Sequence, residues 1–216
     1  MSAPCSPATR VTTPPGRILG ASFFARPSDL VAPDLIGKIL WRKGVGGGRL
    51  TEVEAYLPVD DPACHGARGP TPRNRALFGP PGTIYVYASY GVHVLLNLVC
   101  DRASAASAVL IRSYEPMGIL DVQACNRGFD PERFDLQDLS RGPGRIGQAL
   151  GLDLSLNGLR AGNASGIYIL DDGARPIVTS SSRVGISLAK ELQLRFCEEG
   201  SPFVSRGGKP GRGECR

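Results

Sequence analysis

The chain has 216 residues, of which 42% are hydrophobic, and this is enough for one domain with a buried core. It contains no run of 18 apolar residues, which excludes a membrane-spanning helix, and its N-terminus lacks the apolar segment of a secretory signal. The formal net charge of +5 suits an anionic partner but does not identify one.

The start of the chain predicts an extension, a helix and two paired strands. Residues 1–16 are rich in Ser, Thr and Pro, so we expect a disordered N-terminal extension. Residues 21–40 resemble a short helix that leads into a strand at 36–41. The glycine run 44–48 predicts a turn, after which residues 49–56 pair back as the second strand.

A long proline-rich loop follows at residues 57–81. Loops of this length in a compact domain are usually functional. The segment 62–100 contains no Asp or Glu but does contain Arg68, Arg73 and Arg75. Such a segment suits a phosphate backbone, whereas a solvated loop in an arginine-rich sequence is the plainer alternative.

Residues 82–99 predict two strands joined near Tyr90 and Gly91. Side-chain alternation places Tyr85 and Tyr87 on one face. Tyr90 at the tip is hard to explain as a core residue. An exposed ring in that place suits wedging between stacked bases.

The rest of the chain predicts a β run at 108–114, helices at 117–127 and 142–150, and short strands near its end. The second helix follows Gly142 and Pro143, and its free backbone N–H groups at Gly144, with Arg145 alongside, could hold a phosphate. The same residues also make an ordinary helix start. The short strands are expected at 167–170, at 177–178 and around 183–186 and 194–196, and residues 205–216 are expected to form a flexible basic tail.

Glu54 places a carboxylate at the end of an apolar strand. A carboxylate in a partly apolar pocket can act as a general base on water when another group holds both in place. Arg112 ends a β run that could lie beside the Glu54 strand, and it is the best candidate for that group. A structural Glu–Arg pair is a common alternative, and spacing alone slightly favours it.

Aromatic residues gather in the sequence after Glu54. Together with a histidine, they could sandwich a planar ring, or they could form an ordinary aromatic core cluster, and the sequence favours neither. These residues are Tyr56, His65, Tyr85, Tyr87 and Tyr90.

The six cysteines form no C-x-x-C pair, and only Cys64 adjoins a histidine. We therefore expect no metal site and no cofactor. Reduced thiols in a cytoplasmic protein, associated with the nucleoid if it is bacterial, are the plain interpretation.

Several motifs follow one another along the chain. They are V-E-A-Y at 53–56, a histidine eleven residues after Glu54, T-P-R-N-R at 71–75, P-G-T-I-Y-V-Y-A-S-Y-G at 81–91, Asn97, L-I-R-S-Y-E-P at 110–116 and R-G-P-G-R-I-G-Q-A-L at 141–150. In type and order they resemble the 3-methyladenine (alkyladenine) DNA glycosylase family. The resemblance runs from about Ala21 to Val204, and T-P-R-N-R joined to the Tyr-rich hairpin is its most specific part.

This resemblance implies a fold. We expect a single mixed α/β (α+β) domain, spanning 17–204, around a curved, mainly antiparallel β-sheet with surrounding helices. A β-hairpin would protrude from it into the minor groove of DNA.

The resemblance also implies roles for individual residues. The catalytic group consists of Glu54 as the general base, Arg112 as its water-orienting partner and the backbone carbonyl of Val184 as the third water contact. The residues expected to recognise DNA are Tyr56, His65 and Tyr87 as the rings that hold the extruded base, Asn97 as the pocket-floor residue that disfavours guanine, Tyr90 as the residue that fills the gap in the helix, and Arg73, Arg75, Gly144 and Arg145 along the DNA backbone.

The implied activity is that of a monofunctional DNA glycosylase, which starts base excision repair. It would flip alkylated or deaminated purines such as 3-methyladenine and 7-methylguanine out of duplex DNA and hydrolyse their N-glycosidic bond. The motifs leave hypoxanthine and ethenoadenine open. None of the four lysines falls in a site motif, so no amine is available for a lyase reaction.

Two other classes of function compete with this one. A non-catalytic nucleic-acid-binding module could use the same basic loop and tyrosines, but it gains nothing from a carboxylate that faces a polyanion. A small-molecule hydrolase is disfavoured by the acid-free segment 62–100. We therefore expect a monomer that binds double-stranded DNA containing damaged purines and does not bind membranes.

Overall fold

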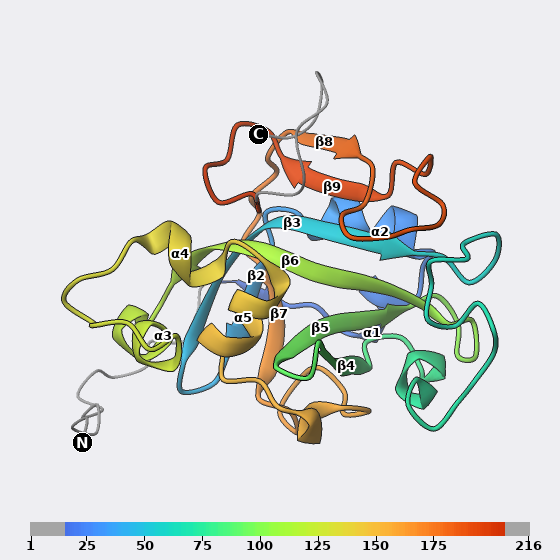
Figure 1. Ribbon diagram of the computed structural model, residues 1–216, viewed down its shortest axis with the longest axis horizontal. Coiled ribbons are helices and arrows are strands. Elements are labelled where there is room, and N and C mark those ends of the chain that lie inside the picture. Colours follow the sequence, from blue (N-terminus) through green and yellow to red (C-terminus); the bar gives the residue numbers. More distant parts are fainter. Residues whose placement is uncertain (1–15, 206–216) are drawn as a thin grey trace.

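A nine-stranded sheet organises residues 16–205, the part of the chain that the computed structural model describes (Figure 1). Every ladder in this part of the chain is antiparallel. The strands are β1 (Arg17–Ile18), β2 (Ile39–Arg42), β3 (Gly46–Tyr56), β4 (Ile84–Ser89), β5 (His93–Cys100), β6 (Ser107–Met117), β7 (Ile167–Asp171), β8 (Val178–Ser181) and β9 (Arg195–Glu198).

Short helices surround the sheet (Figure 1). The predicted mixed α/β fold around a curved, mainly antiparallel sheet is therefore confirmed. None of the helices within residues 16–205 has the length and apolar character that crossing a bilayer requires. The helices are α1 (Ala21–Phe24), α2 (Ser28–Leu35), α3 (Leu120–Asn126), α4 (Leu136–Ser140) and α5 (Pro143–Ala149), with 3₁₀ turns at Arg75–Phe78 and Leu154–Leu156.

The order of strands in the sheet is β1-β7-β2-β3-β6-β5-β4, and β9 joins it beside β3. The long strand β3 changes partners along its length. Its first residues pair with β2, and residues 52–54 pair with β9, while β6 runs along the other side. The second half of β3 is thus enclosed between two strands.

Side-chain alternation divides the sheet into a core face and a site face. Val53, Val86 and Ile111 belong to the main hydrophobic core, which α2 and α5 cover. Tyr85 and Ala108 point the opposite way and form a smaller cluster with the loop 57–81. This second face carries the candidate site.

Irregular pairing between β3 and β6 re-aims the polar side chains. Glu52 pairs with Ser113, which is one residue out of step with the pair Leu50–Tyr114 before it and with the pair Val53–Ile111 after it, so the register shifts at Glu52 and then shifts back. Such a bulge adds a residue locally and turns its side chain. Arg112 lies at this irregularity.

The glycine run did not form the predicted turn over 44–48, because β3 already begins at Gly46. Gly47 and Gly48 lie inside the strand. A Cβ on Gly47 would lie 1.9 Å from the carbonyl oxygen of Leu40, and one on Gly48 would lie 2.1 Å from the ring of Tyr114. These glycines permit close packing.

Helix boundaries also differ from the prediction. The helix expected within 21–40 is split into α1 and α2, since Pro27, with a ψ of 140°, has a non-helical backbone just before α2. The helix expected at 117–127 begins only at Leu120, because Gly118 has a φ of 86°. Helix α4 was not predicted at all.

The predicted N-terminal extension and basic tail lie almost entirely outside residues 16–205. One residue assigned to the tail is described. Ser205 is buried and donates hydrogen bonds to Glu52, so the ordered chain continues at least to this point.

Candidate active site

A cavity of about 500 Å³ opens on the site face. Its walls come from the loop 57–81, from strands β3 to β6 and from the loop 182–194, which precedes β9. Most of the predicted site residues surround this space. Those that line it are Tyr56, His65, Tyr87, Tyr90, Asn97, Arg112 and Val184.

Glu54 is fully buried directly behind the cavity wall. Its Oε1 accepts a hydrogen bond from the backbone N–H of Val184 at 2.7 Å, and Nη1 of Arg112 lies 3.3 Å from the same oxygen. The hydroxyl of Tyr56 donates to Oε2 at 3.0 Å. All three partners line the cavity, so the carboxylate is held by polar groups and does not point into packed hydrocarbon.

A second carboxylate, Glu52, lies on the same face of β3 and is also fully buried. Nε of Arg112 donates to Glu52 at 2.7 Å, and Nε of Arg195 donates to the same oxygen at 2.8 Å. Burial alone would raise the pKa of Glu52, but Arg112 and Arg195 outweigh it and lower that pKa overall. Glu52 is therefore an anion at neutral pH.

Glu52 and Arg195 were not predicted as site residues from the sequence. The alternation of Glu52, Glu54 and Tyr56 along T-E-V-E-A-Y was the available signal, because it places all three side chains on one face. The partner Arg195 lies 143 residues further on and could not be found from local pattern.

A buried ion pair fixes the loop that carries Val184. Arg183 donates to both oxygens of Asp61 at 2.6 and 2.7 Å, and both side chains are inaccessible to solvent. Its guanidinium carbon lies 4.6 Å from the ring centroid of Tyr56, and its Nη1 donates to the carbonyl oxygen of Ala55 at 3.0 Å. The pair thus joins the loop 182–194 to β3 and to the loop 57–81.

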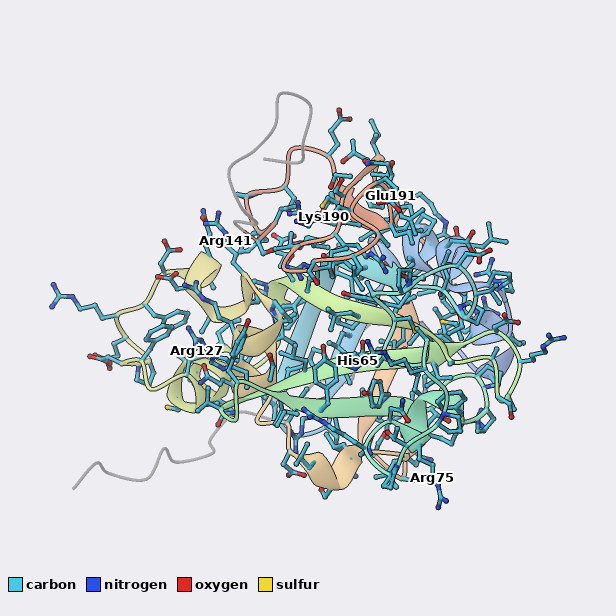
Figure 2. The ribbon with its side chains drawn as sticks, turned by 45° about the vertical axis from the view of Figure 1, so that its right-hand side comes forward. His65, Arg75, Arg127, Arg141, Lys190 and Glu191 are labelled. Carbon is cyan, nitrogen blue, oxygen red and sulfur yellow. The ribbon has the colours of Figure 1, made fainter. Side chains whose placement is uncertain are left out.

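The rings of the cavity form a connected set. His65 and Tyr87 meet edge to face with their centroids 4.6 Å apart, and the centroids of Tyr85 and Tyr87 lie 5.5 Å apart. Tyr85 supports His65 through a 2.9 Å hydrogen bond between its hydroxyl and Nδ1. Figure 2 shows His65 near the middle of the site face.

The ionisation of these rings follows from burial. Burial, and then the charge of Arg73, lower the pKa of His65, so the imidazole is neutral at neutral pH. Burial, followed by the negative charge of Glu54, raises the pKa of Tyr87 to about 12. The same two causes raise the pKa of Tyr56. The cavity therefore presents neutral rings.

Asn97 is buried on β5, where its Nδ2 donates to the carbonyl oxygen of Tyr85 at 3.1 Å. This bond fixes the direction of the amide at the cavity floor.

Tyr90, unlike Asn97, is exposed. It lies at the tip of the β4–β5 hairpin, where 96% of its surface is accessible to solvent and its φ is 51°. It stands at the rim of the cavity.

The arginines predicted to meet the DNA backbone are not all near the cavity. Arg73 donates to the carbonyl oxygen of Ala88 at 3.2 Å and lines a neighbouring hollow of about 440 Å³ that Tyr90 also borders. Arg75 lies at the lower edge of the molecule in Figure 2, away from His65.

Gly144 and Arg145 lie in the first turn of α5 and line neither hollow. The Cα of Gly144 faces the imidazole of His93, and a Cβ there would lie 2.9 Å from that ring. Arg145 forms an exposed ion pair with Asp138 at 2.6 Å. Only the preceding residue of the helix, Pro143, lines the cavity.

Residues 16–205 contain no group of three or more His, Cys, Asp or Glu side chains close enough to hold one metal ion. A buried carboxylate next to a cavity with aromatic walls can accept a proton from a water molecule while a flat ring occupies the cavity.

Comparison with known proteins places these residues in a family context. The model of the methylpurine-DNA glycosylase (MPG) family matches residues 22–202. A protein of Rhodopseudomonas palustris (strain BisB18), provisionally named a 3-methyladenine DNA glycosylase, is 47% identical over 191 residues, which cover 88% of this chain and 92% of the relative. Proteins with the same provisional name from Nitrobacter winogradskyi and Burkholderia cenocepacia are 43% and 41% identical over 88% of this chain, and the matches cover 88% and 92% of these relatives.

Proposed function

The chain belongs to the methylpurine-DNA glycosylase family, and from this premise we propose that Glu54 is the general base of its reaction. Family membership makes the protein a hydrolase of N-glycosyl bonds that acts on DNA with damaged bases. The observation that carries the proposal is the placement of the Glu54 carboxylate, which is buried against the cavity by Tyr56, Arg112 and Val184.

In the proposed reaction, Glu54 removes a proton from water and the water oxygen bonds to C1′ of the sugar. The bond between C1′ and the base nitrogen breaks through an oxocarbenium-like state, and the base leaves with the electron pair. Arg112 and the backbone carbonyl of Val184 orient the water. A 3-methyladenine base is cationic and becomes neutral as it leaves, so one carboxylate suffices where glycoside hydrolysis usually needs two.

The three rings of Tyr56, His65 and Tyr87 hold the extruded base. Ring faces attract a cationic base by about 0.5–2 kcal/mol per contact. Neutral tyrosines and a neutral His65 suit this purpose because they add no repelling positive charge, and the low pKa of His65 keeps it in that state. We include 7-methylguanine with 3-methyladenine among the substrates for this reason.

Selection against normal DNA rests on two residues. Asn97 would collide with the 2-amino group of guanine or remain unpaired beside it. Cationic 7-methylguanine carries the same amino group and is released because its positive charge makes it a better leaving group than guanine. Tyr90 fills the gap that the flipped nucleotide leaves, which suits a ring that stands exposed at a hairpin tip. Poorly paired bases are easier to extrude, since unpairing and unstacking cost a few kcal/mol.

The same proposal includes the footprint on DNA and the form of the enzyme. Arg73 and Arg75 contact the phosphate backbone, as do Gly144 and Arg145 at the start of α5. Arg73, which borders the hollow next to Tyr90, has the strongest support. We propose a monomer, formed by the domain 17–204, that acts in the cytoplasm.

Product analysis tests this function. The wild-type protein should release free 3-methyladenine from methylated duplex DNA and leave an intact strand with an abasic site. Borohydride should not trap a covalent complex with DNA, because none of the lysines within residues 16–205 lines the cavity. A trapped complex or a cleaved strand would contradict a monofunctional glycosylase, and the absence of any released base would contradict the function itself.

A further inference from the structure

The buried carboxylate of Glu52 has no part in the reaction proposed above, although it shares Arg112 with Glu54. The guanidinium of Arg112 lies between the two acids, at 2.7 Å from Glu52 and at 3.3 Å from Glu54. All three groups are buried. The shorter contact is with Glu52, which is not the proposed base.

Glu52 is itself held firmly from the far side. Arg195 on β9 donates to its Oε1, and the backbone N–H of Ser205 donates to its Oε2 at 2.6 Å. The hydroxyl of Ser205 adds a bond of 2.9 Å to Oε1. Strands β3, β6 and β9 and the segment ending at Ser205 therefore meet at one carboxylate.

Two carboxylates and two guanidinium groups in this cluster balance in formal charge. Because Arg112 has both acids as neighbours, whatever strengthens its bond to Glu52 weakens its bond to Glu54. A carboxylate that is tightly paired with Arg holds its negative charge more firmly and accepts a proton less readily.

We propose that Glu52 is a positioning residue that holds Arg112 back from Glu54, so that Glu54 remains able to take a proton from water. This inference rests on the proposed role of Glu54 as the base. The lowered pKa of Glu52 agrees with it, since Glu52 must be an anion to hold Arg112.

Two substitutions distinguish a positioning role of Glu52 from a purely structural one. Glu52→Gln removes a negative charge, and Arg195→Gln removes a positive charge. In Glu52→Gln, Arg112 loses its tighter partner and closes on Glu54. The maximal single-turnover rate should fall about tenfold or more, and the midpoint of the acid side of the rate profile should move down by about one pH unit. In Arg195→Gln, Glu52 draws Arg112 more strongly, so that midpoint should move up.

The other charged or titratable groups around Glu54 are the same in both variants. They come from every element that packs against it and are Tyr56 on β3, Tyr87 on β4, Arg112 on β6 and Arg183 in the loop before β9. Opposite shifts of the midpoint in the two variants would therefore come from the loss of Glu52 and of Arg195 themselves. Loss of structure would instead slow both variants without such opposition.

Arg112→Gln separates positioning from a direct electric field. If Glu52 acts through Arg112, the double variant with Glu52→Gln should have the same profile as Arg112→Gln alone. Asp171→Asn is the matched control, because it removes a carboxylate from the ion pair with buried Lys38 on the far side of β2. It should leave the profile unchanged.

Shifts in one direction for Glu52→Gln and Arg195→Gln, or a further shift in the double variant, would overturn the inference. If Glu52→Gln does not fold, the double variant of Arg195→Gln with Arg112→Gln decides the question, because it should have the same profile as Arg112→Gln alone if the effect passes through Arg112. If those results overturn the role of Glu52 while Glu54→Gln is inactive, the proposed function still holds. An inactive wild-type protein, or an active Glu54→Gln variant, would defeat the proposed function instead.

Discussion

At the scale of single residues, Tyr90 stands apart from the buried side chains of the cavity. Its side chain is almost fully exposed, which suits the role in base extrusion that we propose for it. Tyr90→Ala should slow release of a lesion in a good base pair by about tenfold more than release of the same lesion in a mismatch. Single-turnover rates on paired duplexes measure this ratio. An equal loss on both duplexes would rule out the wedge.

Asn97 makes a second prediction at this scale. Its amide is fixed by the carbonyl oxygen of Tyr85, so it cannot easily turn away from a guanine in the cavity. Asn97→Ala should raise the release of undamaged guanine relative to 3-methyladenine by about tenfold or more. Chromatography of the released bases gives the ratio, and an unchanged ratio would assign selection against guanine to another group.

Part of this residue-level picture followed from the sequence. Alternation along β3 predicted that Tyr56 shares a face with Glu54, and the hydrogen bond between them agrees with that. The long-range partners did not follow. Asp61 and Arg183 lie 122 residues apart, and only the folded chain brings them together.

At the scale of elements, the strand β3 depends on its glycines. Gly48 lies against the ring of Tyr114 and the carbonyl oxygen of Glu115, both on β6. Gly48→Ala should therefore destabilise the protein by about 2 kcal/mol or more, because backbone and a buried ring would have to move. Urea denaturation measures the loss. Gly20→Ala is the control, since a Cβ at Gly20 meets nothing, and equal stability of both variants would contradict close packing of β3.

The loop 182–194 gives the next prediction. Asp61→Asn leaves the guanidinium of Arg183 buried without its anion, and breaking such a pair costs about 3 kcal/mol. The loop should loosen and the hydrogen bond from Val184 to Glu54 should weaken, so both stability and the single-turnover rate should fall. Asp34→Asn, which breaks an exposed pair with Arg26, serves as the control. Equal effects of the two substitutions would show that the buried pair does not hold the loop.

Elements were predicted unevenly. The hairpin of β4 and β5 and the strand β6 emerged from alternation and β-branched residues. The start of β3 did not, because a run of glycines has the same local signature in a turn and in a tightly packed strand. Helix α4 was not predicted, because it has only five residues and owes its stability to packing.

At the scale of the whole molecule, stability should fall in acid. Hydrogen bonds from Arg49 lower the pKa of Asp172 to about 2. The pKa of Asp61 is also lowered, since Arg183 and the N–H of Leu57 outweigh its burial, and that of Glu52 is lowered by its arginines. A group with a lowered folded-state pKa stabilises the fold above its unfolded value, about 4, and loses this contribution as pH falls towards the folded value.

The midpoint of urea unfolding should therefore stay nearly constant above pH ~5 and decline steadily below pH ~4. Glu52→Gln should unfold at lower urea near neutral pH and show a shallower acid decline, because one of the titrating groups is gone. A midpoint that stays constant into strong acid would contradict the contribution of these carboxylates.

The architecture as a whole followed from the sequence mainly through family motifs spread over most of the chain. Pairing of β9 with β3 behind the site could not be predicted from local patterns, since it joins residues more than 140 positions apart. That pairing encloses Glu54 and Glu52, so the depth of the site is a property of the complete sheet.

The most direct test compares binding with chemistry in Glu54→Gln. Glutamine keeps the size of the side chain, its one carbonyl oxygen can accept the hydrogen bond from the N–H of Val184, and its amide NH2 can donate to the hydroxyl oxygen of Tyr56. The variant should therefore bind a duplex containing a lesion within a few-fold of wild type. Its single-turnover rate of base release should be lower by about a thousandfold or more, as expected when the group that takes the proton is lost. Release at the wild-type rate by a variant that binds normally would contradict the role of Glu54.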